Sequence, residues 1–253
     1  WLLTPGPLTT SPTVKQAMLH DYGSRDHGFI AVNKRMRERL LAIIHGEGTH
    51  VAVPLQGSGT FVVEAMVSTF LPASGKLLVL VNGAYGRRMI KMCEVAGHDH
   101  AALEWAEDQP VDPVRVEQAL AEDQAITHVA VVHCETTSGV LNPVKAVAEA
   151  VQRQGRPLLI DPLSAFRALA LDAPEVPFDA VVASSNKCLE GVPGIGFCLA
   201  RKAALQETKG NCPSLSLDLH DQGVAMEGNG QWRFTPPTHA ILAFDQALSE
   251  VEA

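Results

Sequence analysis

The chain has 253 residues, and 46% of them are hydrophobic, which is enough for one large core or for one large domain with part of a second. Its 20 Lys and Arg residues face 28 Asp and Glu residues, for a formal net charge of −8. No basic run offsets this acidity, so we do not expect broad binding to nucleic acid.

The cysteine pattern and the length of the apolar runs indicate the cellular compartment of the protein. The five cysteines form no C-x-x-C pair and are odd in number, which argues against a disulfide framework and favours a reducing cytoplasm. We find no signal peptide and no apolar run of about eighteen residues. Neither export nor membrane spanning is therefore expected.

The first part of the chain alternates between helices and strands. Ser11 and Pro12 predict a helix start, with the helix running to about Leu19, and a charged helix at 31–45 is expected to stop at Gly46. Strands are predicted at 50–55 and 76–81. The segment 56–60 opens a helix that ends at residue 70, and a helix at 85–96 is closed by Gly97.

The second part continues the alternation. Asp112 with Pro113, and Asn142 with Pro143, each predict an N-cap and a first helical residue, the latter for a helix to about Gln154. Further strands are predicted at 127–132, 158–161, 180–183 and 194–200, and the chain ends in a helix-like run at 241–253. This order predicts an α/β fold with a mostly parallel sheet covered on both faces. In such sheets, ligands bind at the carboxyl ends of the strands.

Two charged residues follow the ends of predicted buried strands. Asp161 ends the run Pro157-Leu158-Leu159-Ile160, and Lys187 follows Val181-Val182-Ala183 and a short polar turn. Pyridoxal phosphate (PLP) needs a lysine for its Schiff base and an acid for its ring nitrogen. Either residue alone is more simply a strand-end acid or a surface lysine, but the pair favours PLP.

A phosphate cradle is predicted at Ser58, Gly59 and Thr60, because backbone N–H groups and hydroxyls at a helix start bind anions. A plain glycine-rich cap is the alternative. Val62 stands where a dinucleotide-binding G-x-G-x-x-G would need glycine, and no P-loop motif occurs.

Two further loops follow strand ends. Tyr85 lies between glycines at a helix start and could stack on a flat ring, although a packing role is the simpler reading. The segment 133–139 offers hydroxyls and the Glu135 carboxylate at the same edge of the sheet.

Other chemistries find little support. The spacing of His98 and His100 suits a metal, but no cluster completes a site, so we expect a surface strand and no metal. Cys134 is a weak candidate nucleophile, and no G-x-S-x-G elbow of a hydrolase is present.

Assembled, these motifs resemble those of the class V aminotransferase group of fold-type I PLP enzymes, over nearly the whole chain. The resemblance is carried by the segments 3–7, 55–59, 82–86, 133–137, 184–188, 214–219 and 232–235. It implies a three-layer, fold-type I PLP-transferase large domain with a mostly parallel sheet and the start of a C-terminal small α+β domain. The implied division is an N-terminal arm at 1–15, the large domain at 16–240, and the beginning of the small domain at 241–253.

The resemblance also implies roles for individual residues. Lys187 would bind pyridoxal 5'-phosphate covalently, and Asp161 would hold its ring nitrogen. The other implied cofactor-binding residues are Ser58, Gly59 and Thr60 at the phosphate, Tyr85 on the ring, Thr137 and Asn186 beside cofactor or substrate, and Thr235 at the phosphate of a neighbouring subunit. Gly6, in the arm, and Thr137 would border the substrate. The group forms homodimers with active sites at the subunit interface.

The S-S-N-K-C run at 184–188 and the S-L-S-L-D-L run at 214–219 are similar to members that transfer the amino group of 2-aminoethylphosphonate to pyruvate. The implied products are phosphonoacetaldehyde and L-alanine, in phosphonate degradation. The alternatives are an aminotransferase of the alanine–glyoxylate or serine–pyruvate type and, more remotely, a cysteine desulfurase or a catalytically silent PLP-fold binding protein.

Some residues depart from the group's pattern. Pro162 and Arg167 follow Asp161, where relatives usually have smaller residues and glycines. The arginine that holds the substrate's acidic group in this group of enzymes would lie beyond residue 253. The candidates within the chain are Arg25, Arg87, Arg88, Arg167 and Arg233.

Overall fold

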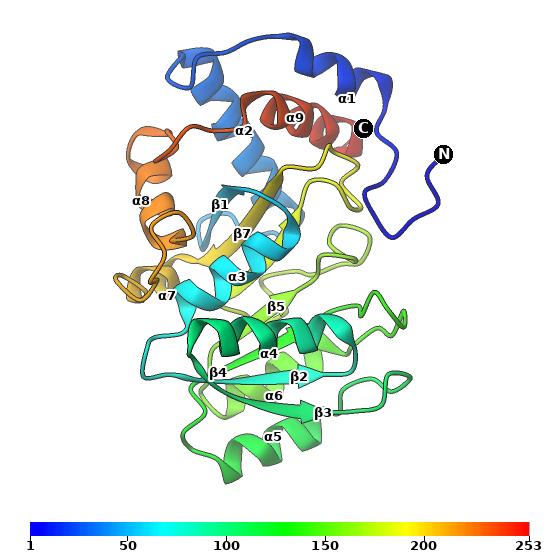
Figure 1. Cartoon of the computed structure of the whole chain (residues 1–253), viewed down its shortest axis with the longest axis vertical. Coiled ribbons are helices and arrows are strands. Elements are labelled where there is room, and N and C mark those ends of the chain that lie inside the picture. The colour runs from blue at the N-terminus through cyan, green and yellow to red at the C-terminus, as the bar shows by residue number, and fades with distance from the viewer. Residues whose placement is uncertain (253) are drawn as a thin grey trace.

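The computed structural model describes residues 1–252 and shows a seven-stranded sheet between two layers of helices (Figure 1). The strands are β1 (His50–Gln56), β2 (Lys76–Val81), β3 (Asp99–Glu104), β4 (His128–Val132), β5 (Leu158–Asp161), β6 (Ala180–Ser184) and β7 (Ile195–Arg201). The helices are α1 (Pro12–Gln16), the 3₁₀ turn η1 (Ala17–Leu19), α2 (His27–Ile43), α3 (Gly59–Phe70), α4 (Ala84–Ala96), α5 (Pro113–Glu122), α6 (Val144–Arg153), α7 (Lys202–Glu207), α8 (Leu219–Asn229) and α9 (Thr238–Glu252). The predicted three-layer α/β fold is confirmed.

The sheet has the strand order β1-β7-β6-β5-β4-β2-β3. The strands from β3 to β6 pair in parallel, whereas β7 pairs antiparallel with both β6 and β1. A parallel pair needs a crossover of a dozen or more residues, usually through a helix, and the loop at 185–194 between β6 and β7 is too short for one. The carboxyl ends of β2, β4, β5 and β6 therefore meet at one edge of the sheet.

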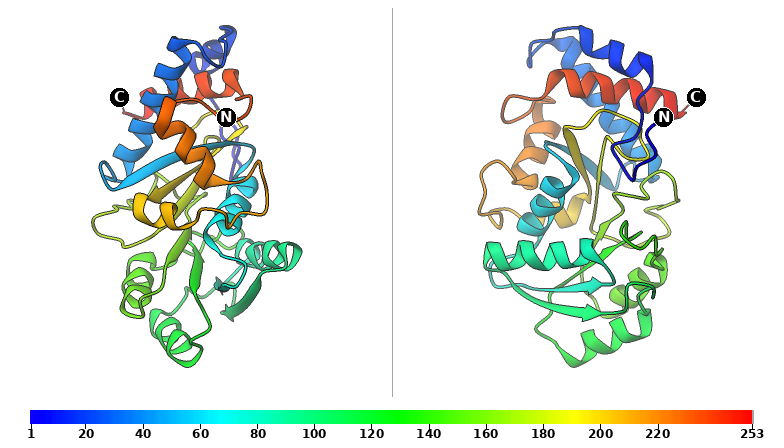
Figure 2. Two further views of the ribbon diagram at one scale, coloured as in Figure 1. Left: turned by 90° about the vertical axis from the view of Figure 1, so that its left-hand side faces the viewer. Right: turned by 45° about the vertical axis from the view of Figure 1, so that its right-hand side comes forward.

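Helices cover both faces of the sheet, as the two turned views show (Figure 2). Alternate residues of β7 serve the two layers: Phe197 packs under α2 and α9, whereas Cys198 packs under α3. Apolar side chains of α2, α5, α6 and α9 form one core, and those of α3, α4, α7 and α8 form the other. A strand buried on both faces is expected to be apolar, as β4 and β7 are apart from His128 at the start of β4 and Arg201 at the end of β7.

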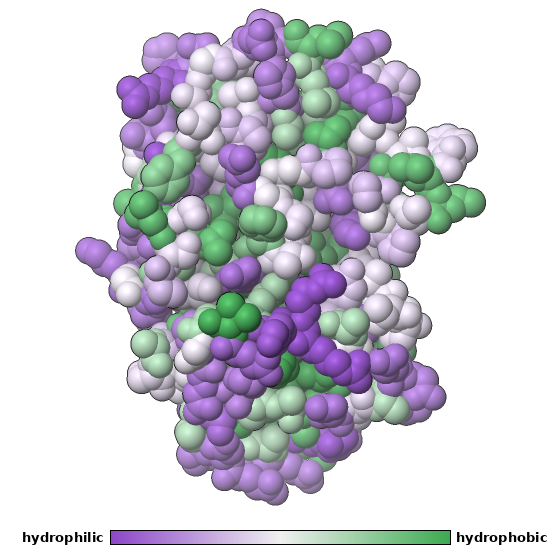
Figure 3. Space-filling model, in the orientation of Figure 1, coloured by the Kyte–Doolittle hydropathy of each residue, from purple (hydrophilic) through white to green (hydrophobic). Residues whose placement is uncertain are grey.

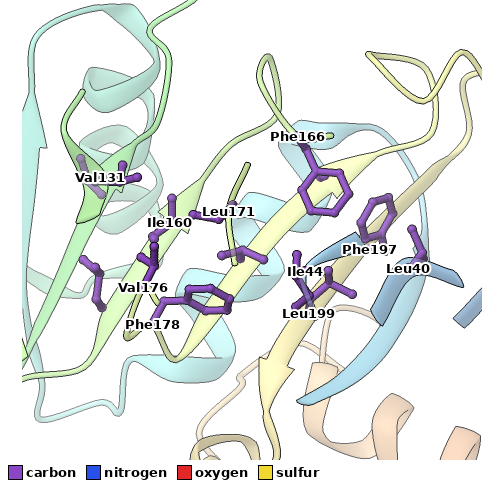
Figure 4. Close-up of a cluster of buried hydrophobic side chains, with 14 of the residues drawn as sticks. Leu40, Ile44, Val131, Ile160, Phe166, Leu171, Val176, Phe178, Phe197 and Leu199 are labelled. Carbon is purple, nitrogen blue, oxygen red and sulfur yellow. The ribbon is translucent and has the colours of Figure 1, made fainter. Parts of the chain in front are cut away.

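The first core is built around aromatic side chains (Figure 4). The ring of Phe197 lies 5.4 Å from that of Phe166 and 5.8 Å from that of Phe244, measured between centroids. All three side chains are buried. This contact fixes the segment that follows Asp161 against β7 and α9, and removing one such ring typically costs about 3–5 kcal/mol.

Several predicted helix ends are confirmed. The Ser11 hydroxyl accepts a hydrogen bond from the Val14 N–H, and Asp112 caps α5 in the same way. Gly97 ends α4 with a φ of 73°, the left-handed conformation that glycine adopts at little cost.

Three helix ends differ from prediction. α2 begins at His27 rather than near Ala31, and the left-handed residue after it is His45 rather than Gly46. α6 is capped by Pro143, not by Asn142. The Asn142 side chain instead accepts from the Val111 N–H and donates to the Val132 carbonyl, so tertiary partners take it away from the helix.

The C-terminal helix α9 lies at the top of Figure 1, beside α1 and α2, whereas α8 lies at the left of the molecule. α9 packs against α1, α2 and β7. Asp218 caps α8, which the sequence pattern did not predict. The division into segments 1–15, 16–240 and 241–253 stays a prediction. Within residues 1–252, no helix combines the length and the apolarity that a bilayer span requires.

Candidate active site

A pocket of about 180 Å³ opens at the edge where β5 and β6 end. Among the described residues, its lining is formed by Ser58, Gly59, Thr60, Val63, Tyr85, Arg88, Thr136, Asp161, Leu163, Ser184, Asn186, Lys187 and Pro193. The parallel sheet thus brings together residues from five separate segments of the chain. Most of the predicted site residues are among them.

Lys187 lies under the N-terminal arm. Its Nζ donates a hydrogen bond to the Pro5 carbonyl, at 3.0 Å. A Cβ atom on Gly6 would lie 2.5 Å from the Lys187 Cδ atom, and Gly6 has a φ of 128°. Glycine is therefore required at this position on two counts, because the arm approaches the lysine closely and its backbone is left-handed.

Asp161 is the buried acid of the pocket, with 2% of its surface exposed. Burial raises the pKa of its carboxyl to about 7, and the nearby Glu135 carboxylate adds to the rise. The Leu163 N–H, which donates to Asp161 Oδ1 at 2.9 Å, opposes it, as do Arg88 and Lys187. A cationic ligand beside this carboxyl would therefore stabilise its ionised form.

The N-terminus of α3 presents free polar groups. Ser58 occupies the N-cap position, but its hydroxyl makes no capping hydrogen bond. A Cβ on Gly59 would lie 2.6 Å from a methyl carbon of Leu163. A residue with a side chain would therefore push the start of α3 away from the segment that follows Asp161. Such a helix start offers unpaired N–H groups to an anion.

Glu135 positions the start of α4. It is fully buried, and its carboxylate accepts the Tyr85 backbone N–H at 3.2 and 3.3 Å. A side chain at Gly83 would collide with Glu135, which explains the glycine before the helix. The carboxylate thereby fixes Tyr85 at the pocket wall.

Three predicted residues lie outside the pocket lining, namely Gly6, Thr137 and Thr235. Gly6 nevertheless lies against the Lys187 side chain. The Thr137 hydroxyl donates to Glu135 Oε1 at 3.1 Å, and its neighbour Thr136 lines the pocket. Thr235 lies in a separate hollow with Arg25 and Arg233. The role of Thr235 was predicted for a neighbouring subunit, so this separation neither supports nor opposes it.

The sequence did not single out several of the lining residues, among them Ser184, Leu163 and Arg88. Ser184 ends β6, is 2% exposed, and its hydroxyl has no hydrogen-bond partner among the described residues. Leu163 and Arg88 also line the pocket. A polar residue at the carboxyl end of a buried strand was a usable signal for Ser184, whereas nothing local distinguished Arg88 from Arg87.

The sequence of the chain matches a known protein family over most of its length. The family model described as aminotransferase class V matches residues 18–252, and the chain belongs to that family. The membership places it among the aminotransferases.

Curated relatives indicate which kind of aminotransferase the chain is similar to. The chain is 55% identical to 2-aminoethylphosphonate–pyruvate transaminase 2 of Burkholderia lata, over 98% of this chain and 66% of the relative. It is 56% identical to 2-aminoethylphosphonate–pyruvate transaminase 1 of a Polaromonas species, over 98% of this chain and 67% of the relative. The chain thus spans about two thirds of the length of these relatives.

Solved structures share the fold. Alanine–glyoxylate aminotransferase from a Nostoc species superposes with a TM-score of 0.91 at 23% identity, over 98% of this chain and 66% of that one. Aspartate aminotransferase from Thermus thermophilus superposes with a TM-score of 0.90 at 26% identity, over 99% of this chain and 70% of that one. These likenesses confirm the fold-type I architecture.

The cofactor of the family is pyridoxal 5'-phosphate, and the pocket residues fit it. A primary amine, a buried carboxyl and an unpartnered buried hydroxyl face one hollow beside a free helix N-terminus. These are the groups that an aldehyde, a pyridine nitrogen and a phosphate need.

Proposed function

We propose that the protein transfers the amino group of 2-aminoethylphosphonate to pyruvate with pyridoxal 5'-phosphate, giving phosphonoacetaldehyde and L-alanine, as a step in phosphonate degradation. The observation that carries the proposal is the pairing of Lys187 with the buried Asp161 in one pocket. The names of the relatives at about 55% identity support the choice of substrates.

The bound cofactor supplies a carbonyl that takes the amine and a ring that accepts the electron pair left when a C–H bond breaks. Lys187 would hold the cofactor at rest. We propose that, once the amine substrate has displaced it from the cofactor, its Nζ takes the proton from the amine-bearing carbon and delivers a proton to the carbon that came from the cofactor's carbonyl group. A positioned base of this kind typically contributes ~10²–10⁴-fold to the rate.

Asp161 would keep the ring nitrogen protonated. Its carboxyl has a pKa raised to about 7 by burial, and a cationic ring N–H beside it would favour the ionised form. We propose that Ser58, Gly59 and Thr60 hold the phosphate, that Tyr85 stacks on the ring, and that Asn186 helps to orient the cofactor or the substrate. Tyr85 is held at the wall by its N–H bond to Glu135, which supports that role.

The arm would border the substrate. The carbonyl of Pro5 holds the Lys187 amine, and Gly6 lies against the lysine side chain. This placement supports a role for Gly6 in closing the pocket to water beside the reacting atoms. Thr137 would act on substrate or cofactor from its bond to Glu135.

We further propose a homodimer, with Thr235 reaching the phosphate in the partner's pocket. Trp1 and Leu3 are almost fully exposed on the arm, and Phe234 beside Thr235 is 50% exposed. Figure 3 shows hydrophobic atoms where the arm projects from the body. Such apolar groups support an interface. Light scattering that gives a monomer mass at assay concentration would contradict the dimer.

The proposed compartment is the cytoplasm. All five cysteines are free thiols, as Cys93 and Cys198 in the core illustrate. Free buried thiols are typical of proteins in a reducing compartment.

The test of the function is an absorbance titration of the purified, cofactor-loaded protein. The long-wavelength band of the lysine-bound cofactor should disappear on adding 2-aminoethylphosphonate and return on adding pyruvate. Lys187→Ala should lack the band. A band that is bleached by alanine or serine, but not by the phosphonate, would contradict the proposed substrate.

A further inference from the structure

The first turn of α4 is capped from a distant part of the chain. Gly83 occupies the N-cap position and has no side chain with which to accept the N–H groups that a helix leaves free at its start. Glu135, which lies 50 residues from Tyr85 in the sequence, accepts the Tyr85 N–H instead. Tyr85 is the second residue of α4, and an N-cap side chain usually accepts from the second or third residue. The Glu135 carboxylate therefore acts as the cap of α4.

The same carboxylate also holds the loop that follows β4. Glu135 Oε1 accepts the Thr137 hydroxyl at 3.1 Å and the Tyr85 N–H at 3.3 Å, while Oε2 accepts that N–H at 3.2 Å. Tyr85 and Thr136, the neighbour of Thr137, both line the pocket. The Glu135 side chain is fully buried, and the positive end of the α4 dipole favours its charge. One carboxylate thus joins two walls of the pocket.

The glycine at position 83 makes room for this bridge. A Cβ atom there would lie 2.2 Å from Glu135 Cγ and 2.8 Å from Glu135 Oε2. The φ of Gly83 is 174°, an extended conformation that any residue adopts. The close approach of Glu135, and not the backbone conformation, therefore requires glycine. A methyl group at position 83 would displace the carboxylate without removing it from the protein.

We propose that Glu135 is a positioning residue for the cofactor, which holds Tyr85 and the loop at 136–137 in the one arrangement that fits the ring. The inference rests on the proposed function, in which Tyr85 stacks on the ring of pyridoxal 5'-phosphate. Glu135 is not among the described residues that line the pocket, so it acts through the residues that it holds. A carboxylate suits this task because charge-assisted hydrogen bonds are about twice as strong as neutral ones.

The test uses a cofactor form that binds without a covalent bond. Pyridoxamine 5'-phosphate has no aldehyde for Lys187, so its dissociation constant reports the non-covalent contacts of the pocket alone. Calorimetry on the protein freed of cofactor measures this constant in wild type, Glu135→Ala, Glu135→Gln and Gly83→Ala. The matched control is Asp112→Ala, because Asp112 caps α5 by accepting the N–H of its second residue, Val114, at 2.9 Å, away from the pocket.

We expect Glu135→Ala to raise the dissociation constant ~10–100-fold, since charge-assisted bonds to both walls are lost. Gly83→Ala should raise it about 10-fold, although the protein keeps every carboxylate. Glu135→Gln should stay within about 5-fold of wild type, because its amide oxygen still accepts the Tyr85 N–H. Asp112→Ala should change the constant less than about 2-fold, although it also removes a helix cap.

A second readout reports how the ring lies in the pocket. The visible circular dichroism of the protein loaded with pyridoxal 5'-phosphate arises from the asymmetric surroundings of the ring. Per unit of absorbance, this signal should fall in Glu135→Ala and Gly83→Ala and should persist in Glu135→Gln and Asp112→Ala. A residue that only stabilised the fold would leave this ratio unchanged in folded, loaded protein.

Three results would each overturn the inference. The first is wild-type cofactor affinity and dichroism in Gly83→Ala, a variant that decides the question even if Glu135→Ala does not fold. The second is an equal loss of affinity in Asp112→Ala, which would make the effect one of global stability. The third is a loss in Glu135→Gln as large as the loss in Gly83→Ala, which would show that hydrogen bonding by Glu135 does not position the cofactor.

The proposed function can fail independently of this inference. If the variants change cofactor binding as expected, but the wild type does not transaminate 2-aminoethylphosphonate, then the proposed function fails and the assignment of Glu135 stands. If the wild type transaminates the phosphonate and the variants bind the cofactor normally, then the assignment of Glu135 fails alone.

Discussion

Two buried acids at opposite edges of the sheet are treated differently by the fold. Asp179 precedes β6, and its carboxylate accepts from the Arg201 guanidinium and from the Leu158 N–H. Asp161 ends β5 at the pocket, accepts the Leu163 N–H, and makes no ion pair within the described chain. The acid at one edge is thus neutralised by its own chain, whereas the acid at the other is not.

The size of a hollow does not decide which of the two acids is available to a ligand. The hollow beside Asp179 is about 820 Å³, much larger than the pocket at Asp161. Asp179, however, is already paired with Arg201, so its carboxylate has little left to gain from a cationic ligand. An unpaired buried acid costs folding free energy, and a cationic ligand can recover that cost.

The largest expected effect concerns the lysine beside the unpaired acid. Lys187→Ala should lower kcat by ~10²–10⁴-fold, because the proposed base is removed. The unfolding midpoint of the cofactor-free protein should change little, since the Lys187 amine makes one bond, to the Pro5 carbonyl. A steady-state assay and a urea titration check both parts. Full activity in this variant would remove Lys187 from the mechanism.

Asp161→Asn should stabilise the cofactor-free protein at alkaline pH while impairing activity. The folded pKa of Asp161 is raised to about 7, so the folded state binds more protons than the unfolded state between about pH 4 and 7. Wild-type stability therefore falls through that window as pH rises. The gain from Asn should be near zero at pH 4 and about 2–4 kcal/mol above pH 8.

Urea unfolding of the cofactor-free protein at pH 4.5 and 8.5 measures this gain. Leu163 keeps an acceptor in the variant, because an amide oxygen replaces the carboxylate oxygen. A gain that is equal at both pH values would show that Asp161 is not held protonated by burial.

Gly6→Ala should lower kcat/KM about 10-fold. The backbone at Gly6 has a φ of 128°, where a Cβ is strained by about 1–3 kcal/mol, and the added carbon would press on the Lys187 side chain. The control is Gly48→Ala, at a φ of 80° with open space around it. Equal losses of activity in both variants would show that the arm does not act on the lysine.

Asp179→Asn should have the smallest effect, and with the opposite sign to Asp161→Asn. It weakens the contact with Arg201, whose side chain is 48% exposed and can turn to water, so we expect a loss of about 1–2 kcal/mol at neutral pH. Activity should be unchanged. Stabilisation by this variant at pH 8.5 would erase the distinction between the two acids.

Local patterns in the sequence were enough to locate these helices and strands and the edge of the sheet at which the site residues meet. Alternating apolar runs located β2 and β5 to the residue, and Gly97 and Ser11 marked helix ends, because periodicity and capping are local properties. Since parallel strands share their carboxyl edge, Lys187 and Asp161 were predicted to lie together, and they do.

The surroundings of that pair depend on packing between distant segments. Thr136 rather than Thr137 and Arg88 rather than Arg87 line the pocket, and the Ser184 hydroxyl has no partner among the described residues. Packing also takes Asn142 from its predicted cap into a network with β4. Side-chain direction in a loop or on a helix face depends on packing between distant segments, so neighbouring residues of one type look alike in sequence and differ in the fold.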